Sequence, residues 1–136
     1  MSLPETPSLT TKAEIVIIDN DPITCLIQEA KVRSRFSQPL HVFQDAREAL
    51  QFMTEAADTD FLILLDIDMP EMDGWEFLSE WQKIGGDSEV KVIMLSCSIS
   101  NSEKVRSRTF PMVVDYFEKP LYNSDLEVMA EILSSF

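Results

Sequence analysis

The chain has 136 residues, which suits a single domain, and 45% of them are hydrophobic while 26% are charged. This balance is typical of a globular protein rather than a disordered one. Acidic residues outnumber basic ones by 24 to 11, for a net charge of −13. Such a domain repels the phosphate backbone, so we expect no nucleic-acid partner. The longest apolar run, residues 61–65, is too short to span a bilayer, and we expect no membrane partner.

The first twelve residues lack the basic start and apolar stretch of a signal peptide. We expect residues 1–12 to form a flexible leader, part of it compatible with an extension added for expression, and residues 13–136 to form the domain. Cys25 and Cys97 are too few for a disulfide framework, so a reducing, cytoplasmic location is expected.

The N-terminal half alternates between short apolar runs and amphipathic segments. Residues 13–18 (AEIVII) predict a strand that ends at Asp19, and Pro22 is suited to the first turn of the following helix. That helix repeats apolar residues at helical spacing, namely Ile23, Leu26, Ile27 and Ala30. Residues 40–43 (LHVF) predict a second strand. Asp45, three residues before Glu48, indicates a capping box that opens a second helix.

The C-terminal half continues the alternation. Residues 61–66 (FLILLD) are apolar on both faces, which is typical of a central strand of a parallel sheet. A helix with Trp75, Phe77 and Trp81 follows and stops at the glycines 85–86. Residues 90–96 predict a strand, Ser100 opens a weak helix closed by Pro111, and residues 112–117 predict a fifth strand. The last helix is lined by Leu126, Met129, Ala130 and Leu133.

Five strands that alternate with five helices predict an α/β fold with a parallel sheet covered on both faces. In such sheets the ligand site lies beyond the carboxyl ends of the strands. The residues at these ends are Asp19, Asn20 and Asp21, then Asp66 and Asp68, then Ser96, and finally Lys119 followed by Pro120. Clustered carboxylates need a hard cation such as Mg²⁺, and a hydroxyl and an ammonium can hold phosphoryl oxygens. The set therefore indicates an aspartate that accepts a phosphoryl group.

Each of these residues has a simpler explanation when it is taken alone. A carboxylate after a strand usually caps a helix or forms a turn, and a single serine or lysine usually contacts the backbone or solvent. The combination at successive strand ends is what favours a site. His41 has no nucleophile beside it and is expected to be structural, and Cys97 is expected to be a small, buried packing residue.

Four of these stretches resemble the receiver domains of two-component response regulators. IVIIDNDP resembles their first strand and acidic cluster, and LLDIDMPEMDGWEFL resembles the phosphoacceptor strand and its turn. VIMLSC and YFEKPL resemble the strands that end in a hydroxyl residue and in Lys-Pro. The resemblance runs from about residue 13 to the end. It implies a flavodoxin-like (βα)5 three-layer sandwich with strand order 2-1-3-4-5.

The resemblance also implies a role for each residue that occupies a functional position of the family. Asp66 would be phosphorylated, and Mg²⁺ would be bound by Asp19, Asn20, Asp66 and the backbone carbonyl of Asp68, with Asp21 as a further candidate. Ser96 and Lys119 would contact the phosphoryl group, and Tyr116 would reorient when Ser96 engages it. The bond between Lys119 and Pro120 would be cis.

The Asp66-Ile67-Asp68 stretch also fits the nucleophile motif of the haloacid dehalogenase-like phosphatases. In that family the motif opens the catalytic core, and the further acids follow the lysine. In this chain the acids precede Asp66, no acidic pair closes a strand after Lys119, and the chain is short for a phosphatase core. The order of the motifs favours the receiver.

Two positions depart from the receiver pattern. Asn20 replaces a carboxylate, so we expect weaker Mg²⁺ affinity and slower phosphorylation than in a fully acidic site. Asp68 is uncommon two residues after the acceptor, and its carboxylate can repel or orient the water that hydrolyses the phosphoaspartate. The lifetime of the phosphorylated state is therefore left open.

The resemblance implies a bacterial signalling protein that is not an enzyme beyond its own phosphorylation and dephosphorylation. Its phosphoryl donor would be a histidine kinase or a histidine phosphotransfer protein, and its output would be a protein partner bound at the face of the fourth helix, fifth strand and fifth helix. No output domain is expected after Phe136, so the chain would act alone or be excised from a larger regulator. The alternative in another class is a degenerate receiver that binds partners without phosphorylation.

Overall fold

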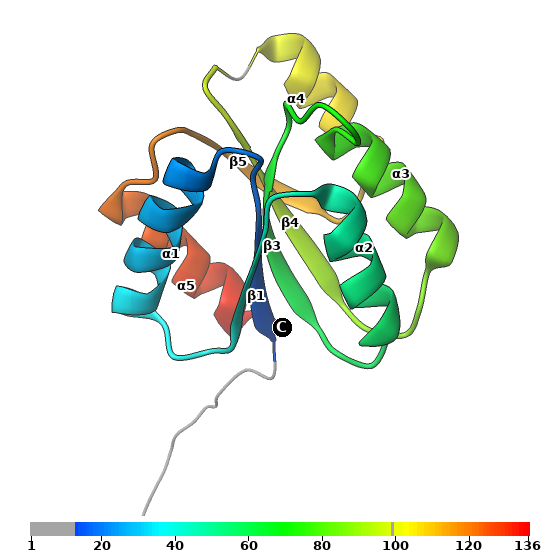
Figure 1. Cartoon of the computed structure of the whole chain (residues 1–136), viewed down its shortest axis with the longest axis horizontal. Coiled ribbons are helices and arrows are strands. Elements are labelled where there is room, and N and C mark those ends of the chain that lie inside the picture. The colour runs from blue at the N-terminus through cyan, green and yellow to red at the C-terminus, as the bar shows by residue number, and fades with distance from the viewer. Residues whose placement is uncertain (1–12, 99) are drawn as a thin grey trace, which may run out of the picture.

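The computed structural model describes residues 13–98 and 100–136. The leader predicted at residues 1–12 lies outside the described residues. Strands and helices alternate along the chain, as predicted (Figure 1). They are β1 (Glu14–Ile18), α1 (Pro22–Arg35), β2 (Leu40–Phe43), α2 (Ala46–Glu55), β3 (Phe61–Asp66), α3 (Gly74–Ile84), β4 (Val90–Ser96), α4 (Asn101–Ser107), β5 (Val113–Glu118) and α5 (Asn123–Ser134).

The strands form one parallel sheet in the order β2-β1-β3-β4-β5, which confirms the predicted fold class. Strand β3 is central and buried at every position, because helices cover both of its faces. Strand β5 lies at an edge, and a register shift interrupts its pairing with β4. The order places the ends of β1 and β3 side by side, since Ile18 pairs with Leu65.

Helices α1 and α5 cover one face of the sheet, and α2, α3 and α4 cover the other (Figure 1). Successive strand residues point to opposite faces, so each strand contributes to both cores. In β3, Phe61, Ile63 and Leu65 pack with α2 and α3, whereas Leu62 and Leu64 pack with α1 and α5. No helix in the described part of the chain is long and apolar enough to cross a membrane.

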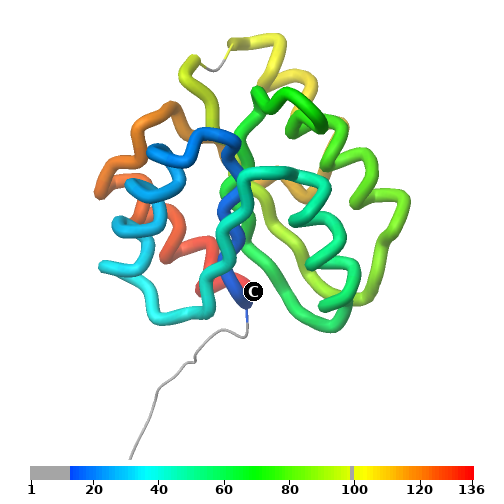
Figure 2. The backbone as a smooth tube through the Cα atoms, viewed as in Figure 1, coloured from blue at the N-terminus to red at the C-terminus, as the bar shows by residue number. Residues whose placement is uncertain are grey.

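The helices begin where polar side chains cap them. Asp45 caps α2 by accepting from the Arg47 N–H, while Asp73 and Ser100 form full capping boxes at α3 and α4. The loops that follow the strands gather at one end of the molecule, the upper end in Figure 2. This end carries every polar strand-end residue singled out from the sequence.

The apolar repeat that predicted α1 does not define its buried face. Ile23, Leu26 and Ile27 are exposed, and the helix instead buries Cys25, Gln28 and Val32. Periodicity marks a helix, but packing against the sheet and α5 decides which side faces inward. Helix α4 ends at Ser107, well before Pro111, and is correspondingly short.

Candidate functional site

Two buried carboxylates and one ammonium meet at the carboxyl end of the sheet. Asp19 follows β1 and is 2% exposed, and Asp66 ends β3 and is 4% exposed. The Nζ of Lys119, which follows β5, lies 2.7 Å from Asp19 Oδ2 and 3.2 Å from Asp66 Oδ1. Strands β1 and β3 are neighbours, so the two carboxylates share one cation.

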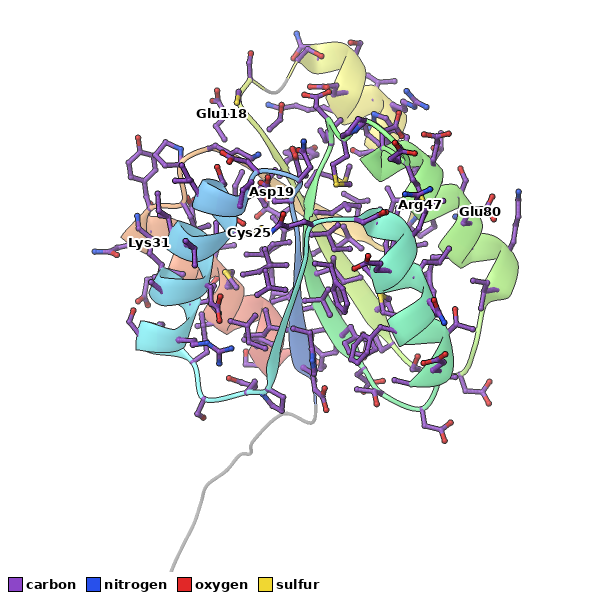
Figure 3. The ribbon with its side chains drawn as sticks, viewed as in Figure 1. Asp19, Cys25, Lys31, Arg47, Glu80 and Glu118 are labelled. Atoms are coloured by element: carbon purple, nitrogen blue, oxygen red, sulfur yellow. The ribbon has the colours of Figure 1, made fainter. Side chains whose placement is uncertain are left out.

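The backbone and side chain of Asp19 are held from several directions. Its Oδ1 accepts from the Asp21 N–H at 2.9 Å, and its N–H donates to the Phe43 carbonyl at 3.0 Å. The buried Cys25 thiol donates to the Asp19 carbonyl at 3.0 Å (Figure 3). The bond from Asp21 orients the carboxylate before any ligand binds, and the other two bonds hold the backbone that carries it.

The pKa of Asp66 is raised from its ordinary value to about 6. Burial is the main cause, and the neighbouring Asp19 charge adds to it, while Lys119 offsets part of the rise. Burial on its own would lower the pKa of Lys119, but its hydrogen bond to Asp19 and the Asp66 charge outweigh burial and raise it. The lysine is therefore held in its charged form, and the cluster retains an excess of negative charge.

The other acidic positions lie at the rim of this cluster. The Asp21 carboxylate caps α1 and accepts from Thr24 Oγ1 at 2.6 Å and from the Ile23 N–H at 3.2 Å. These two hydrogen bonds lower the pKa of Asp21. Asn20 and Asp68 are exposed. The Asp68 N–H lies 3.4 Å from Asp66 Oδ1, so it is the backbone of Asp68 that faces the central carboxylate.

The atoms at this end that could bind a metal ion are oxygen atoms, which suits Mg²⁺ better than a softer metal. In the described part of the chain, no three His, Cys, Asp or Glu side chains are grouped closely enough to hold a metal by themselves. A cation bound by Asp19 and Asp66 would therefore need the Asn20 amide or backbone carbonyls to complete its shell. The residues present fit that requirement.

Gly74 allows the turn after β3 to pass close to Asp66. A Cβ at this position would lie 2.9 Å from the Asp66 carbonyl oxygen and 3.1 Å from the Cα of Ile67. Both are backbone atoms, so a larger residue would displace the strand end that carries the central carboxylate. The Gly74 N–H also donates to the Ile67 carbonyl at 2.9 Å.

Ser96 and Tyr116 lie on the β4 and β5 side of the cluster. Ser96 is buried, its hydroxyl donates to the Ser98 carbonyl at 3.0 Å, and it accepts from the Ser98 N–H at 3.2 Å. Its carbonyl accepts from the Lys119 N–H at 2.8 Å. Tyr116 is half-buried, and the Lys119–Pro120 peptide bond is cis.

The structure also shows the positions of His41, which was expected to be structural, and Cys97, which was expected to be buried. His41 lies in β2, where its Nε2 is 2.7 Å from Glu14 Oε1 and its ring packs on Phe52. The prediction that Cys97 is a buried packing residue is wrong, because its side chain is exposed in the loop after β4. The residue after a strand end leaves the sheet, so its exposure depends on the path of the loop.

Two contacts that support the site could not be predicted from the sequence. Cys25 reaches the Asp19 carbonyl from inside α1, and the Lys31 ammonium donates to the Leu121 carbonyl just after Lys119 and Pro120. Both side chains are labelled in Figure 3. Neither contact belongs to a motif, and both depend on the rotation of α1 that the apolar pattern misassigned.

The chain matches the family model of the response regulator receiver domain over residues 15–131. The two-component response regulator ARR11 of Arabidopsis thaliana is 28% identical over 115 residues, which are 85% of this chain and 21% of that protein. ARR18 of the same plant is 27% identical over 113 residues, 83% of this chain and 17% of that protein. The chain thus spans about a fifth of the length of these curated relatives.

Solved structures share the fold. A two-component response regulator from Cytophaga hutchinsonii has a TM-score of 0.81 at 19% identity, covering 93% of this chain and 99% of its own. The receiver domain of the histidine kinase CKI1 from Arabidopsis thaliana, complexed with Mg²⁺ and BeF₃⁻, has a TM-score of 0.74 at 23% identity, covering 93% of each chain. The curated relatives are plant proteins, so the comparisons do not support the expected bacterial source. By its sequence match and its fold, the chain belongs to the response regulator receiver domain family.

Proposed function

We propose that this domain accepts a phosphoryl group on Asp66 in a Mg²⁺-dependent reaction and thereby changes its protein partners. The observation that carries the proposal is the buried cluster in which the Lys119 ammonium contacts both Asp19 and Asp66. The donor would be a histidine kinase or a histidine phosphotransfer protein. The domain would catalyse only its own phosphorylation and dephosphorylation, and act in the cytoplasm.

The hydrogen bonds of Asp66 favour one of its oxygens as the nucleophile. Oδ1 contacts the Lys119 ammonium and faces the Asp68 N–H, whereas Oδ2 has no hydrogen-bond partner among the described residues. Oδ2 would attack phosphorus, forming the Asp66 oxygen–phosphorus bond as the bond from phosphorus to the donor's leaving atom breaks. Lys119 would hold the carboxylate in place and then contact a phosphoryl oxygen.

Asp19, Asp66, the Asn20 amide and the Asp68 carbonyl would hold Mg²⁺, with Asp21 retained as a helix cap. When bound, the ion would neutralise the charge that the reacting oxygens gather at phosphorus. The complex of a family member, the CKI1 receiver domain, with Mg²⁺ and BeF₃⁻ supports this proposal by analogy. Asp19 is well suited to the role because its carboxylate is already oriented by Asp21 and Lys119.

Ser96 and Tyr116 would change their side-chain orientation in response to the phosphoryl group. The Ser96 hydroxyl would leave Ser98 and turn toward the new dianion, and Tyr116 would follow into the space behind it. The face made by α4, β5 and α5 would then bind a downstream protein. We propose no nucleic-acid or membrane partner for this domain.

The proposal is tested by incubating the protein with Mg²⁺ and acetyl phosphate, a small phosphoryl donor, and measuring its mass. We expect one phosphoryl adduct per chain, lost in Asp66→Asn and absent without Mg²⁺. No adduct in the unchanged protein would support a degenerate receiver that acts without phosphorylation. Continuous hydrolysis of a phosphate ester such as p-nitrophenyl phosphate would support the phosphatase alternative.

Asn20 provides a graded test of the Mg²⁺ site. Asn20→Asp adds a carboxylate beside Asp19, so we expect tighter Mg²⁺ binding by about tenfold and faster adduct formation. Mg²⁺ titration followed by Trp fluorescence or NMR measures the affinity, and mass spectrometry measures the rate. Asp68→Asn, which alters the charge at the rim but leaves the backbone carbonyl, is the matched control. Unchanged affinity and rate in Asn20→Asp would place the ion elsewhere.

A further inference from the structure

Helix α4 is attached to the domain by basic side chains rather than by an apolar face. Its only buried residue is Ser107, whereas α3 buries a row of aromatic and aliphatic side chains. The Lys104 ammonium lies 5.5 Å from the centroid of the Tyr116 ring, and the Arg106 guanidinium lies 4.7 Å from the Trp75 ring. Cations at such distances are attracted to the ring face. One cation thus links α4 to β5, and another links it to α3.

The same segment also holds Ser96. The loop between β4 and α4 supplies Ser98, whose carbonyl and N–H both bond to the Ser96 hydroxyl. Helix α4 supplies Lys104, whose ammonium lies over the Tyr116 ring. The two side chains that would respond to the phosphoryl group, Ser96 and Tyr116, are therefore both restrained by contacts from α4 and the loop before it.

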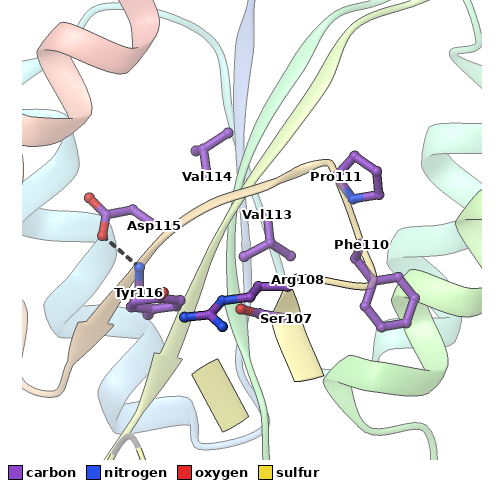
Figure 4. A pocket seen from close by; sticks show the side chains of 8 residues that line it. All are labelled: Ser107, Arg108, Phe110, Pro111, Val113, Val114, Asp115 and Tyr116. Atoms are coloured by element: carbon purple, nitrogen blue, oxygen red, sulfur yellow. Dashed lines mark hydrogen bonds between the residues drawn. The ribbon is translucent and has the colours of Figure 1, made fainter. Parts of the chain in front are cut away.

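Tyr116 has room to move if the restraint is lost. Its side chain lines a cavity of about 250 Å³ between the end of α4 and β5, next to Ser107 and Val113 (Figure 4). Its backbone is held separately, because Tyr116 pairs with Met94 of β4 in the sheet. The ring can therefore change its rotamer without any change in the strand.

We propose that Lys104 is a positioning residue that holds the Tyr116 ring against α4 and so opposes the rearrangement that follows phosphorylation. The inference rests on the proposed function, because it concerns the equilibrium between the resting and phosphoryl-engaged arrangements. Removing the cation frees the ring, so less of the phosphoryl group's binding free energy is needed to turn Ser96 and Tyr116. Lys104 thereby lowers the affinity of the site for a phosphoryl group.

The sign of the effect separates this role from simple electrostatics. Lys104 is a positive charge in a chain of net charge −13. If it acted only through its field, its loss would weaken binding of an anion at the site. If it restrains Tyr116, its loss strengthens that binding. Lys104 and Tyr116 are both half-buried, and we expect a cation–ring contact between them to correspond to a change of about two- to fivefold.

The experiment uses the phosphoryl mimic beryllofluoride with Mg²⁺ and the variant Lys104→Met, which keeps the apolar stem and removes the charge. The chain has two tyrosines, so labelling with 3-fluorotyrosine gives two ¹⁹F signals, and Tyr122→Phe assigns the signal of Tyr116. We expect Lys104→Met to bind beryllofluoride about two- to fivefold more tightly. We also expect its Tyr116 signal, before ligand is added, to lie closer to the ligand-bound position of the unchanged protein.

Two variants control the result. Lys104→Arg keeps a cation over the ring and should restore the affinity and the signal of the unchanged protein. Lys83→Met removes one exposed positive charge, which is paired with Glu80 and contacts no aromatic ring among the described residues, and it should leave both unchanged. Equal or weaker binding by Lys104→Met, with normal binding by the unchanged protein, overturns the inference alone. Absence of beryllofluoride binding by the unchanged protein overturns the proposed function and this inference together.

Discussion

The acidic end of β1 and β3 and the α4 region lie at the same end of the sheet but are built in opposite ways. The first holds Asp19 and Asp66 nearly inaccessible to solvent, tied to Lys119 and to backbone groups. The second exposes most of α4 and joins it to the domain through Lys104 and Arg106. A tightly held cluster of charged side chains and a helix that can rearrange at little cost in free energy therefore lie at the same end of the sheet.

The buried cluster of Asp19, Asp66 and Lys119 is expected to destabilise the folded protein when Asp66 is ionised. Because the pKa of Asp66 is raised to about 6, the folded protein keeps a proton between about pH 4 and pH 6 that the unfolded chain has released. The free energy of unfolding therefore falls as pH rises through this window. Asp66→Asn removes the penalty, so without Mg²⁺ it should stabilise the protein at neutral pH by about 1–3 kcal/mol.

Urea denaturation with a chelator, repeated from about pH 5 to about pH 7.5, measures this difference. The gain from Asp66→Asn should grow with pH. Asp68→Asn removes an exposed carboxylate two residues away and should change stability little. A destabilised Asp66→Asn protein at neutral pH would mean that the ion pair with Lys119 outweighs burial, which would contradict the account of the cluster given above.

The two capping boxes provide a smaller test that compares the regions directly. Asp73 caps α3, which is part of the core, and Ser100 caps α4, which is not. Asp73→Ala should lower the free energy of global unfolding by about 1 kcal/mol. Ser100→Ala should lower it by less than about half of that, because α4 can unfold locally while the core remains folded.

Hydrogen exchange distinguishes local from global effects in these two variants. Ser100→Ala should speed exchange in α4 and leave α3 unchanged, whereas Asp73→Ala should speed exchange throughout the core. Equal losses of global stability in the two variants would show that α4 folds as part of the core. The contrast between the two regions would then not hold.

Much of this molecule was determined by local sequence. The apolar runs predicted every strand, because a strand buried between two helical layers needs apolar residues on both faces, as in residues 61–66. Asp45 and Ser100 were recognised from the sequence as helix starts, and the structure shows both as N-caps. The alternation of elements placed Asp19, Asp66, Ser96 and Lys119 at one end of the sheet, where the structure shows them.

The side chains of helices and loops that contact this cluster could be identified only once the layers were packed together. The apolar residues of α1 predicted the helix but not its rotation, because contact with the sheet and α5 buries Cys25 and Gln28 and leaves Ile23 and Leu26 exposed. The same rotation brings Cys25 to the Asp19 carbonyl. The contact of Lys104 with Tyr116 joins residues of different elements. Such contacts follow no local period or motif, since they depend on how the packed layers are placed in space.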